Sequence, residues 1–364
     1  MTDIAVWSYE REYDALREEI LGAIDEAFAS GQLILGHSVR AFESSFARWA
    51  GVAHGVGVGN GTDALALALR AAGVAPGDEV ITVAFTALPT VTAIAQTGAR
   101  PVFVDVDEEG LMDPARVEEA ITDRTRAIVP VHLYGQCADV PRIERVASER
   151  GIAVVEDCAQ SAGARIDERL AGTFGAAAAH SFYPTKILGA YGDGGLVATT
   201  DSQLAERVRR LRVYDATPGI GAAGVGVNSR LDEVQAAVLS VKLAYVDGWI
   251  DRRRDIASAY ATRLEGTGLR LPNELPRRRH VWHLYVVQHP DRDAVARELR
   301  HRGVGTGVHY PIPVHEMPAF RGLAPPEGLP VTERLARTVL SLPMHPWLAQ
   351  SEIDTITARL REVV

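Results

Sequence analysis

From about residue 52 to residue 157, short apolar runs alternate with segments that have helical patterns. The runs include GDEVITV, PVFVDV, AIVPV and IAVVED, and the segments between them carry helix start and stop signals such as Pro89, Asp113 and Gly151. Because the runs are apolar at successive positions, they resemble strands that are buried on both faces. Repeated strand–helix alternation predicts an α/β fold with a parallel sheet covered by helices.

The pattern changes near residue 230, where LDEVQAAVLSVKLAYVDGWIDRRRDIASAYATRLEG predicts a long helical stretch. After it, HLYVVQH and VGTGVHY are predicted strands, and DRDAVARELRHRG and SEIDTITARLREVV are predicted helices. We therefore expect a large domain at 31–245 and a smaller α+β domain at 246–364. The N-terminal segment, 1–30, should pack with the smaller domain or bridge the two.

Charge and cysteine content exclude several classes of protein. The formal net charge is −9, from 47 acidic and 38 basic residues, which argues against a general nucleic-acid binder. Cys137 and Cys158 lack metal-ligand spacing, so we expect no metal site and two small core residues in a reducing cytosol. No apolar signal segment and no run of about 18 apolar residues is present, which predicts a cytoplasmic protein without a membrane span.

The segment GVGVGNGTDAL, residues 55–65, is the first candidate for chemistry. Gly59 and Gly61 allow close backbone approach, and Thr62 or Asp63 can cap the helix that follows. A helix N-terminus offers free N–H groups and a positive dipole to a phosphate. The segment lacks the third glycine of a dinucleotide fingerprint and the lysine of a P-loop. A plain tight turn remains the alternative.

Two more candidates follow the predicted strands IAVVED and AAAAHSF, at whose carboxyl ends the functional groups of parallel sheets gather. Asp157 ends IAVVED, and Gln160 can reach the same space; a helix cap or a surface acid is the alternative. Lys186, in SFYPTKILGAYGDGG, is the only lysine before Lys242 in a chain rich in arginine. Most lysines are simply solvated, but the flanks of Lys186 carry little charge.

A pyridoxal 5′-phosphate site needs a phosphate-binding helix N-terminus, a carboxylate at a strand end and a desolvated lysine. The carboxylate keeps the pyridine nitrogen protonated, which makes the ring an electron sink. Burial lowers a lysine pKa, and the neutral amine is then a nucleophile. Arginine does not deprotonate in proteins, which explains a lysine at residue 186.

Nine segments, spread over nearly the whole chain, resemble those of the DegT/DnrJ/EryC1/StrS sugar aminotransferases in the same order. They are GQLILGHSVRAFESSFARWAG, GNGTDALALAL, GDEVI, GARPVFVDVD, RAIVPVHLYG, VVEDCAQSAGA, SFYPTKILGAYGDGG, GVNSRLDEVQAA and GVHYPIPVH. The resemblance implies fold type I of the pyridoxal-phosphate-dependent transferases, the aspartate aminotransferase-like fold. This fold has a large domain with a mixed, mostly parallel sheet and a smaller α+β C-terminal domain. It further implies a homodimer with sites at the interface.

The resemblance also assigns residues. Lys186 matches the catalytic lysine that holds the cofactor, and Asn228 matches an asparagine that reaches the phosphate from the neighbouring subunit. Many relatives stack an aromatic on the ring where Ala87 stands here, so Phe85 is assigned to the ring face; many also carry histidine at the position of Ala162. The other residues that match cofactor ligands are Gly61, Thr62, Asp157, Gln160 and Ser181.

Polar residues in three segments are candidates to bind the sugar nucleotide. They are Tyr183, Arg230, His309, Tyr310 and His315. Each also has a structural interpretation, since histidines beside prolines are often structural and Arg230 can form a salt bridge at a helix start.

By this resemblance the protein transfers the amino group of L-glutamate to a nucleotide-linked keto-deoxyhexose, with dTDP as the nucleotide. Such a step belongs to deoxyamino-sugar biosynthesis, for an antibiotic or a polysaccharide. EDCAQSAGA and SFYPTK look closer to relatives that form 3-amino sugars, which favours C3 over C4. A lysine rather than a histidine at 186 favours transamination over sugar dehydration. The alternatives are a scyllo-inosose-type aminocyclitol aminotransferase and a non-catalytic regulator with the same fold.

Overall fold

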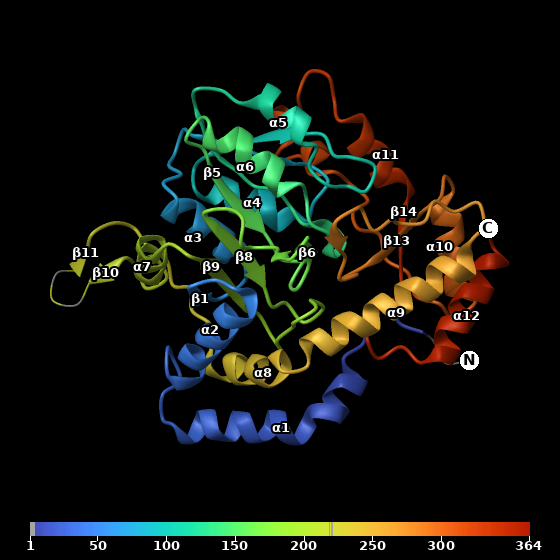
Figure 1. Cartoon of the computed structure of the whole chain (residues 1–364), viewed down its shortest axis with the longest axis horizontal. Coiled ribbons are helices and arrows are strands. Elements are labelled where there is room, and N and C mark those ends of the chain that lie inside the picture. Colours follow the sequence, from blue (N-terminus) through green and yellow to red (C-terminus); the bar gives the residue numbers. More distant parts are fainter. Residues whose placement is uncertain (1–3, 218, 220) are drawn as a thin grey trace.

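A seven-stranded sheet forms the centre of the larger part of the molecule, in the order β1-β9-β8-β5-β4-β2-β3 (Figure 1). The structure is a computed structural model that describes residues 4–217, 219 and 221–364. The strands of this sheet are β1 (His54–Val58), β2 (Glu79–Val83), β3 (Arg100–Val104), β4 (Thr125–Ile128), β5 (Ala153–Asp157), β8 (Ala177–Ser181) and β9 (Gly195–Thr199). The two pairs that include β9, with β1 and with β8, are antiparallel and the other four pairs are parallel, so the sheet is mixed and mostly parallel, as predicted.

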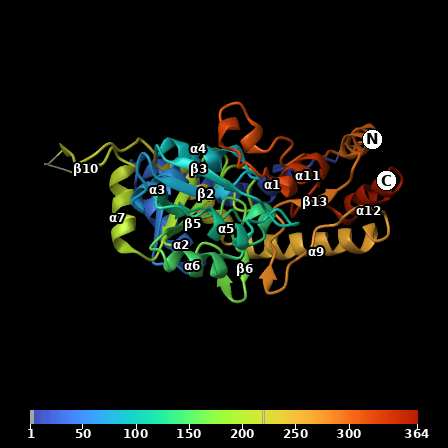
Figure 2. The ribbon, with the colours of Figure 1, turned by 90° about the horizontal axis from the view of Figure 1, so that it is seen from above.

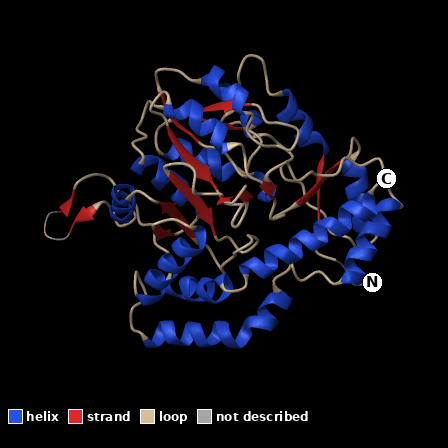
Figure 3. Cartoon of the chain, viewed as in Figure 1, coloured by secondary structure: helices blue, strands red, loops and turns tan. Residues whose placement is uncertain are grey.

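Helices cover both faces of this sheet, and strand side chains alternate between them (Figure 3). Ile81 and Val154 belong to one apolar cluster, whereas their neighbours Val80 and Val155 belong to another. The first cluster packs under α2 (His37–Ala50), α5 (Pro114–Ala120), α6 (Val140–Ser148) and α8 (Glu233–Leu243), and the second under α3 (Gly61–Ala71), α4 (Leu88–Gln96) and α7 (Ser202–Leu211). Burial on two faces explains why the strands read as continuous apolar runs.

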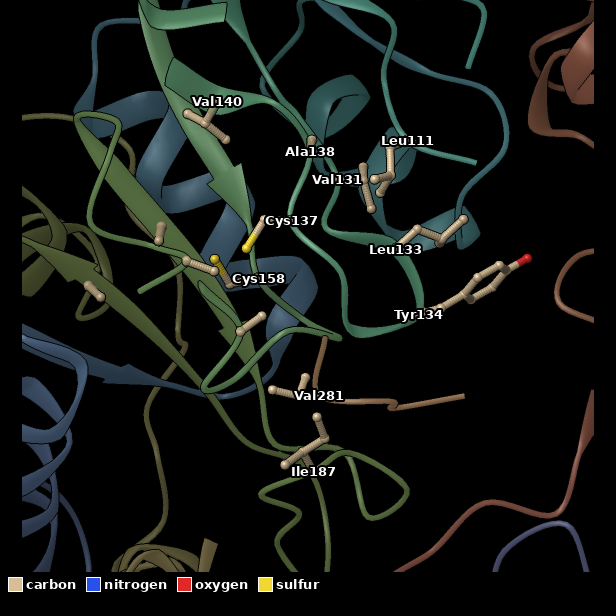
Figure 4. Packing of buried hydrophobic residues seen from close by; sticks show 14 of the residues in the cluster. Leu111, Val131, Leu133, Tyr134, Cys137, Ala138, Val140, Cys158, Ile187 and Val281 are labelled. Atoms are coloured by element: carbon tan, nitrogen blue, oxygen red, sulfur yellow. The ribbon is translucent and has the colours of Figure 1, made fainter. Parts of the chain in front are cut away.

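Both cysteines lie in the first of these clusters, among Val131, Leu133 and Val140 (Figure 4). Cys137 and Cys158 are buried and free, so the prediction of two small core residues is confirmed.

The smaller part of the molecule follows a break in the long helical stretch, after residue 243. Its elements are α9 (Val246–Leu264), β13 (Tyr285–Gln288), α10 (Arg292–His301), α11 (Pro330–Thr338), β14 (Val339–Leu342) and α12 (Gln350–Arg361), and β13 pairs antiparallel with β14. The prediction of a strand over VGTGVHY was wrong, because Val304 and Gly307 form only isolated bridges. Glycines at 305 and 307 weaken strand formation, since they supply no side chain to pack.

The N-terminal segment contacts both parts of the chain. Ile4 pairs with Val304 and is buried in the core of the smaller part. Helix α1 (Glu10–Ala29) instead runs beside α8 (Figure 1), and its Leu16 and Ile20 pack with Val238 of α8. The domain boundaries given above stay a prediction.

The remaining elements are short. They are the 3₁₀ helices η1 (Leu133–Gly135), η2 (Val314–Glu316) and η3 (Arg321–Leu323), the sheet of β6 (Arg165–Ile166), β7 (Arg169–Leu170) and β12 (Arg278–Arg279), and the hairpin of β10 (Ala216–Thr217) and β11 (Gly221–Ala222). The hairpin extends away from the rest of the chain in two perpendicular views (Figures 1 and 2). In the described part of the chain, no helix has both the length and the apolar character that crossing a membrane requires.

Candidate active site

A cavity of about 590 Å³ lies where β5 and β8 end and α3 begins. Its walls also include the first turn of α4 and the loop after β8. Seven of the residues predicted from the sequence line it: Gly61, Thr62, Asp157, Gln160, Ser181, Tyr183 and Lys186. The carboxyl ends of neighbouring strands bring these residues together from distant points of the chain.

The N-terminus of α3 forms one wall of this cavity. Its N-cap is Asn60, whose side-chain oxygen accepts a hydrogen bond of 2.8 Å from the backbone N–H of Asp63. The prediction that Thr62 or Asp63 caps the helix was therefore wrong, because α3 begins one residue before Thr62. The first N–H groups of an α-helix have no partner within the helix, which leaves them able to bind an anion.

A hydrogen-bond network fixes the turn before α3. The Ser229 hydroxyl accepts from the N–H of Gly59 at 2.9 Å and donates to Asp63 Oδ2 at 2.6 Å. Gly61 approaches Ser181 so closely that an added Cβ would lie 2.6 Å from the Cβ of Ser181. Glycine at 61 therefore permits a serine hydroxyl to lie beside the helix N-terminus, and the hydroxyl and the N–H groups together suit a phosphate.

Asp157 is held on the cavity wall by two hydrogen bonds. The Thr90 hydroxyl donates to Asp157 Oδ2 at 2.8 Å, and the N–H of Ala159 donates to Oδ1 at 3.1 Å. Only 7% of Asp157 is exposed. The sequence pattern did not identify Thr90, although a threonine in the first turn of a helix after a strand lies near the strand ends.

The neighbouring carboxylate, Glu156, points the other way, as strand alternation requires. It is fully buried, with Oε2 2.9 Å from His132 Nε2, and it accepts hydrogen bonds from backbone N–H groups that include Gly172. Burial raises the pKa of Glu156, but these hydrogen bonds outweigh it and the pKa lies below its usual range. Glu156 is therefore a structural carboxylate and Asp157 faces the cavity.

Lys186 lies across the cavity in the loop after β8. Its backbone N–H donates to the carbonyl of Tyr183 at 2.8 Å, which makes a turn. Burial lowers the pKa of the Lys186 amine to about 8, although the negative charge of Asp157 raises it. A substantial fraction of the amine is thus neutral near pH 8, which a nucleophile or a general base requires.

Gln160 links this cavity to the smaller part of the chain. Its side-chain oxygen accepts from the backbone N–H of Tyr134 at 2.8 Å, and its amide nitrogen donates to the Tyr310 hydroxyl at 2.9 Å. The Tyr134 hydroxyl in turn donates to the carbonyl of His309. These bonds fix the orientation of the Gln160 amide and hold the segment around residue 310 against the site.

A model of the DegT/DnrJ/EryC1/StrS aminotransferase family matches residues 14–361 of this chain. The chain belongs to this aminotransferase family.

Relatives in the family resemble it over their full length. The dTDP-3-amino-3,4,6-trideoxy-alpha-D-glucose transaminase of Micromonospora megalomicea subsp. nigra is 51% identical over 99% of this chain and 98% of the relative. A pleiotropic regulatory protein of Geobacillus stearothermophilus is 44% identical over 99% of this chain and 98% of the relative. The X-ray structure of S. venezuelae DesV in complex with a ketimine intermediate has a TM-score of 0.96 and 44% identity, and the match covers 100% of this chain and 98% of DesV.

Aminotransferases of this family use pyridoxal 5′-phosphate, and a solved relative holds the pyridoxamine form. When bound, this cofactor supplies an electron sink that labilises bonds at the carbon carrying the amine. The cavity fits it: the N-terminus of α3 with Ser181 suits a phosphate, Asp157 suits a protonated ring nitrogen, and Lys186 suits an aldehyde carbon. The protein is therefore a pyridoxal-phosphate-dependent sugar aminotransferase, as the sequence predicted.

Several predicted residues lie outside the cavity. Phe85 is fully buried and packs edge-on against Tyr134, with ring centroids 6.4 Å apart, so its position does not fit a ring-stacking role. Ala87 lines the cavity instead. His315 packs beside Phe103 in an apolar cluster and only 4% of it is exposed, which does not fit sugar binding.

The other substrate and interface candidates occupy intermediate or exposed positions. His309 is partly buried, and its Nδ1 lies 2.8 Å from the Ser341 hydroxyl. Arg230 is half-buried and its carbonyl lies beside the turn at Gly59, outside the cavity lining. Asn228 is exposed and also lies outside this lining.

Proposed function

We propose that this aminotransferase transfers the amino group of L-glutamate to C3 of a dTDP-linked keto-deoxyhexose. The observation that carries the proposal is the 51% identity, over 99% of the chain, to a dTDP-3-amino-sugar transaminase. The cavity that joins Lys186 with Asp157 supports it, because a regulator that had lost catalysis would not need a desolvated amine facing a fixed carboxylate.

In the proposed mechanism, the residues of the chain bind the cofactor and move protons. The α3 N–H groups and Ser181 would bind the phosphate of the cofactor, Asp157 would keep its ring nitrogen protonated, and Lys186 would hold its aldehyde carbon. The neutral Lys186 amine would accept the proton from the α-carbon of glutamate. In the second half-reaction the protonated amine would donate a proton to the sugar carbon that receives the amino group.

The sugar nucleotide is proposed to enter beside Tyr183. This side chain lines the cavity while 53% of it is exposed, so it lies at the mouth. Tyr310 and His309 are positioned by their contacts with Gln160 and Ser341, and they complete the proposed sugar-binding wall. Arg230, beside the phosphate-binding turn, is assigned to the phosphate side.

Product identification tests this function. The holoenzyme is incubated with L-glutamate and one acceptor at a time. The acceptors are dTDP-3-keto sugars, dTDP-4-keto sugars and scyllo-inosose, and the products are identified by mass spectrometry. We expect an amino sugar only from a dTDP-3-keto substrate, with 2-oxoglutarate formed in equal amount. An amine formed only from a 4-keto sugar or from scyllo-inosose contradicts the assignment. Absence of any product supports the regulator that the name of one relative suggests.

We further propose a homodimer in which Asn228 completes the phosphate site of the partner subunit. Asn228 is exposed and lies outside the cavity lining of its own chain. The segments that flank the β10–β11 hairpin expose the apolar side chains of Tyr214, Val225 and Val227. A group of exposed apolar side chains marks a candidate surface for a second copy to cover.

Mixing two inactive variants tests this arrangement. Lys186→Ala and Asn228→Ala chains are each expected to have low activity, but a hybrid dimer combines one intact Lys186 with one intact Asn228. An equal mixture, unfolded and refolded together, should regain about a quarter of wild-type activity, because half the dimers are hybrids with one working site. No gain over the separate variants contradicts a site shared between subunits.

A further inference from the structure

The chain contains two lysines, Lys186 and Lys242, among 38 basic residues. Lys186 lines the cavity, whereas Lys242 lies on α8 and is 2% exposed. Lys242 takes no part in the mechanism above. A buried ammonium is costly unless charged or polar partners surround it, so its surroundings require an explanation.

Three groups surround the Lys242 amine. It donates to the carbonyl of Gly189 at 2.7 Å, and it forms an ion pair with Glu12 of α1. It also lies 3.8 Å from the centre of the Tyr191 ring, in a cation–π contact. Two of these three partners belong to the loop after β8, the loop that carries Lys186.

The loop that carries Lys186 is tightly folded and is bound to α8. A Cβ added to Gly189 would lie 2.4 Å from the carbonyl oxygen of Pro184, so the two ends of the turn are in contact. The Tyr191 N–H donates to the side-chain oxygen of Gln235 on α8 at 3.0 Å. A shift of the Gly189 carbonyl would therefore move the residues between Pro184 and Gly189, which include Lys186.

We propose that Lys242, with Glu12, is a positioning group that holds the Lys186 loop and thereby keeps the Lys186 amine in its desolvated place. Helix α1 contributes the only carboxylate among the described contacts of Lys242, so the N-terminal helix becomes part of the support of the active site (Figure 1). The inference rests on the proposed role of Lys186.

Lysine suits this place better than arginine. The ammonium is compact and donates in three directions, which matches one carbonyl, one carboxylate and one ring face around a single nitrogen. The planar guanidinium is larger and favours a two-pronged partner. The titratable groups that face Lys242 are Glu12 and Tyr191; burial lowers the pKa of Lys242 and Glu12 raises it.

The state of Lys186 can be measured without turnover. The full-length protein, freed of cofactor, is acetylated with a trace of acetic anhydride over a pH series, and mass spectrometry reports the extent at each lysine. We expect a titration midpoint of about 8 for Lys186 in the wild type. In Lys242→Met, a displaced and more hydrated loop should raise the midpoint by about one unit or more, which makes Lys186 about fivefold or more less reactive at pH 8.

Arg292→Met is the matched control. Arg292 is 7% exposed and donates to the carbonyls of Ala336 and Val339, so its loss also removes a buried cation from backbone carbonyls, but in the smaller part of the chain. Its Lys186 midpoint should stay at the wild-type value. Glu12→Gln should raise the midpoint less than Lys242→Met does, since the bond to Gly189 remains.

An unchanged midpoint in Lys242→Met, or an equal shift in Arg292→Met, overturns the proposal. If Lys242→Met does not fold, Glu12→Gln decides the test, and an unchanged midpoint there overturns it. Failure of the proposed function would appear separately, as a wild-type enzyme that makes no amino sugar while its Lys186 still titrates near pH 8.

Discussion

Lys186→Ala is expected to lose transamination with every substrate. A positioned general base contributes about 10²–10⁴-fold, and Lys186 is also the proposed attachment point of the cofactor, so the loss of kcat should reach or exceed that range. The measurement is 2-oxoglutarate formation from L-glutamate in a single turnover of the loaded enzyme. This design isolates the first half-reaction from sugar binding.

Lys186→Arg separates charge from proton transfer. It keeps a cation in the cavity, but guanidinium does not deprotonate in proteins, so we expect the same loss as in Lys186→Ala. Both variants should still bind the cofactor without a covalent bond, because the N-terminus of α3 and Ser181 remain. Turnover near the wild-type rate in either variant would mean that another group moves the proton.

Asp157→Asn should produce the second-largest effect. Asparagine has nearly the same shape and still accepts the hydrogen bond from Thr90, so the cavity should keep its form. Its neutral amide cannot stabilise a positive charge on the ring nitrogen, and loss of one such fixed charge typically lowers kcat by about 10²–10³-fold. The measurement is again the single-turnover rate with glutamate.

The control for this substitution is Asp167→Asn. Asp167 pairs with Arg277 on the surface, and its side chain is 48% exposed, so its replacement removes a carboxylate that does not line the cavity. We expect wild-type kinetics from Asp167→Asn. Equal rates for the two variants would show that the ring nitrogen does not depend on Asp157.

The fold could be predicted from the sequence because the strands are buried on both sides. Val80 and Ile81 pack into different clusters, and this double burial makes continuous apolar runs that differ clearly from the helical segments between them. Strand β9 was not predicted, since its pairing with β1 joins residues distant in sequence. The hairpin of β10 and β11 was not predicted either, because strands of two residues each are too short to show a periodic pattern.

The cavity residues were predictable where chemistry restricts the residue type. A lysine with uncharged flanks and an acid at a strand end, Lys186 and Asp157, are conspicuous in a sequence. Thr90 and Lys242 were not found, because a threonine on a helix and a lysine on a helix are ordinary until tertiary packing gives them partners. Phe85 was assigned to the ring by its sequence neighbourhood, and the structure turns its side chain into the core.

The central claim is that the Lys186 amine holds pyridoxal phosphate opposite Asp157. The direct measurement is borohydride reduction of the loaded enzyme followed by peptide mass spectrometry, and a chain with two lysines leaves few possible sites for the label. The account predicts one phosphopyridoxyl group per chain, on the peptide that contains Lys186. A label on Lys242 or on the N-terminal amine, or no label on a protein that still transaminates, would contradict it.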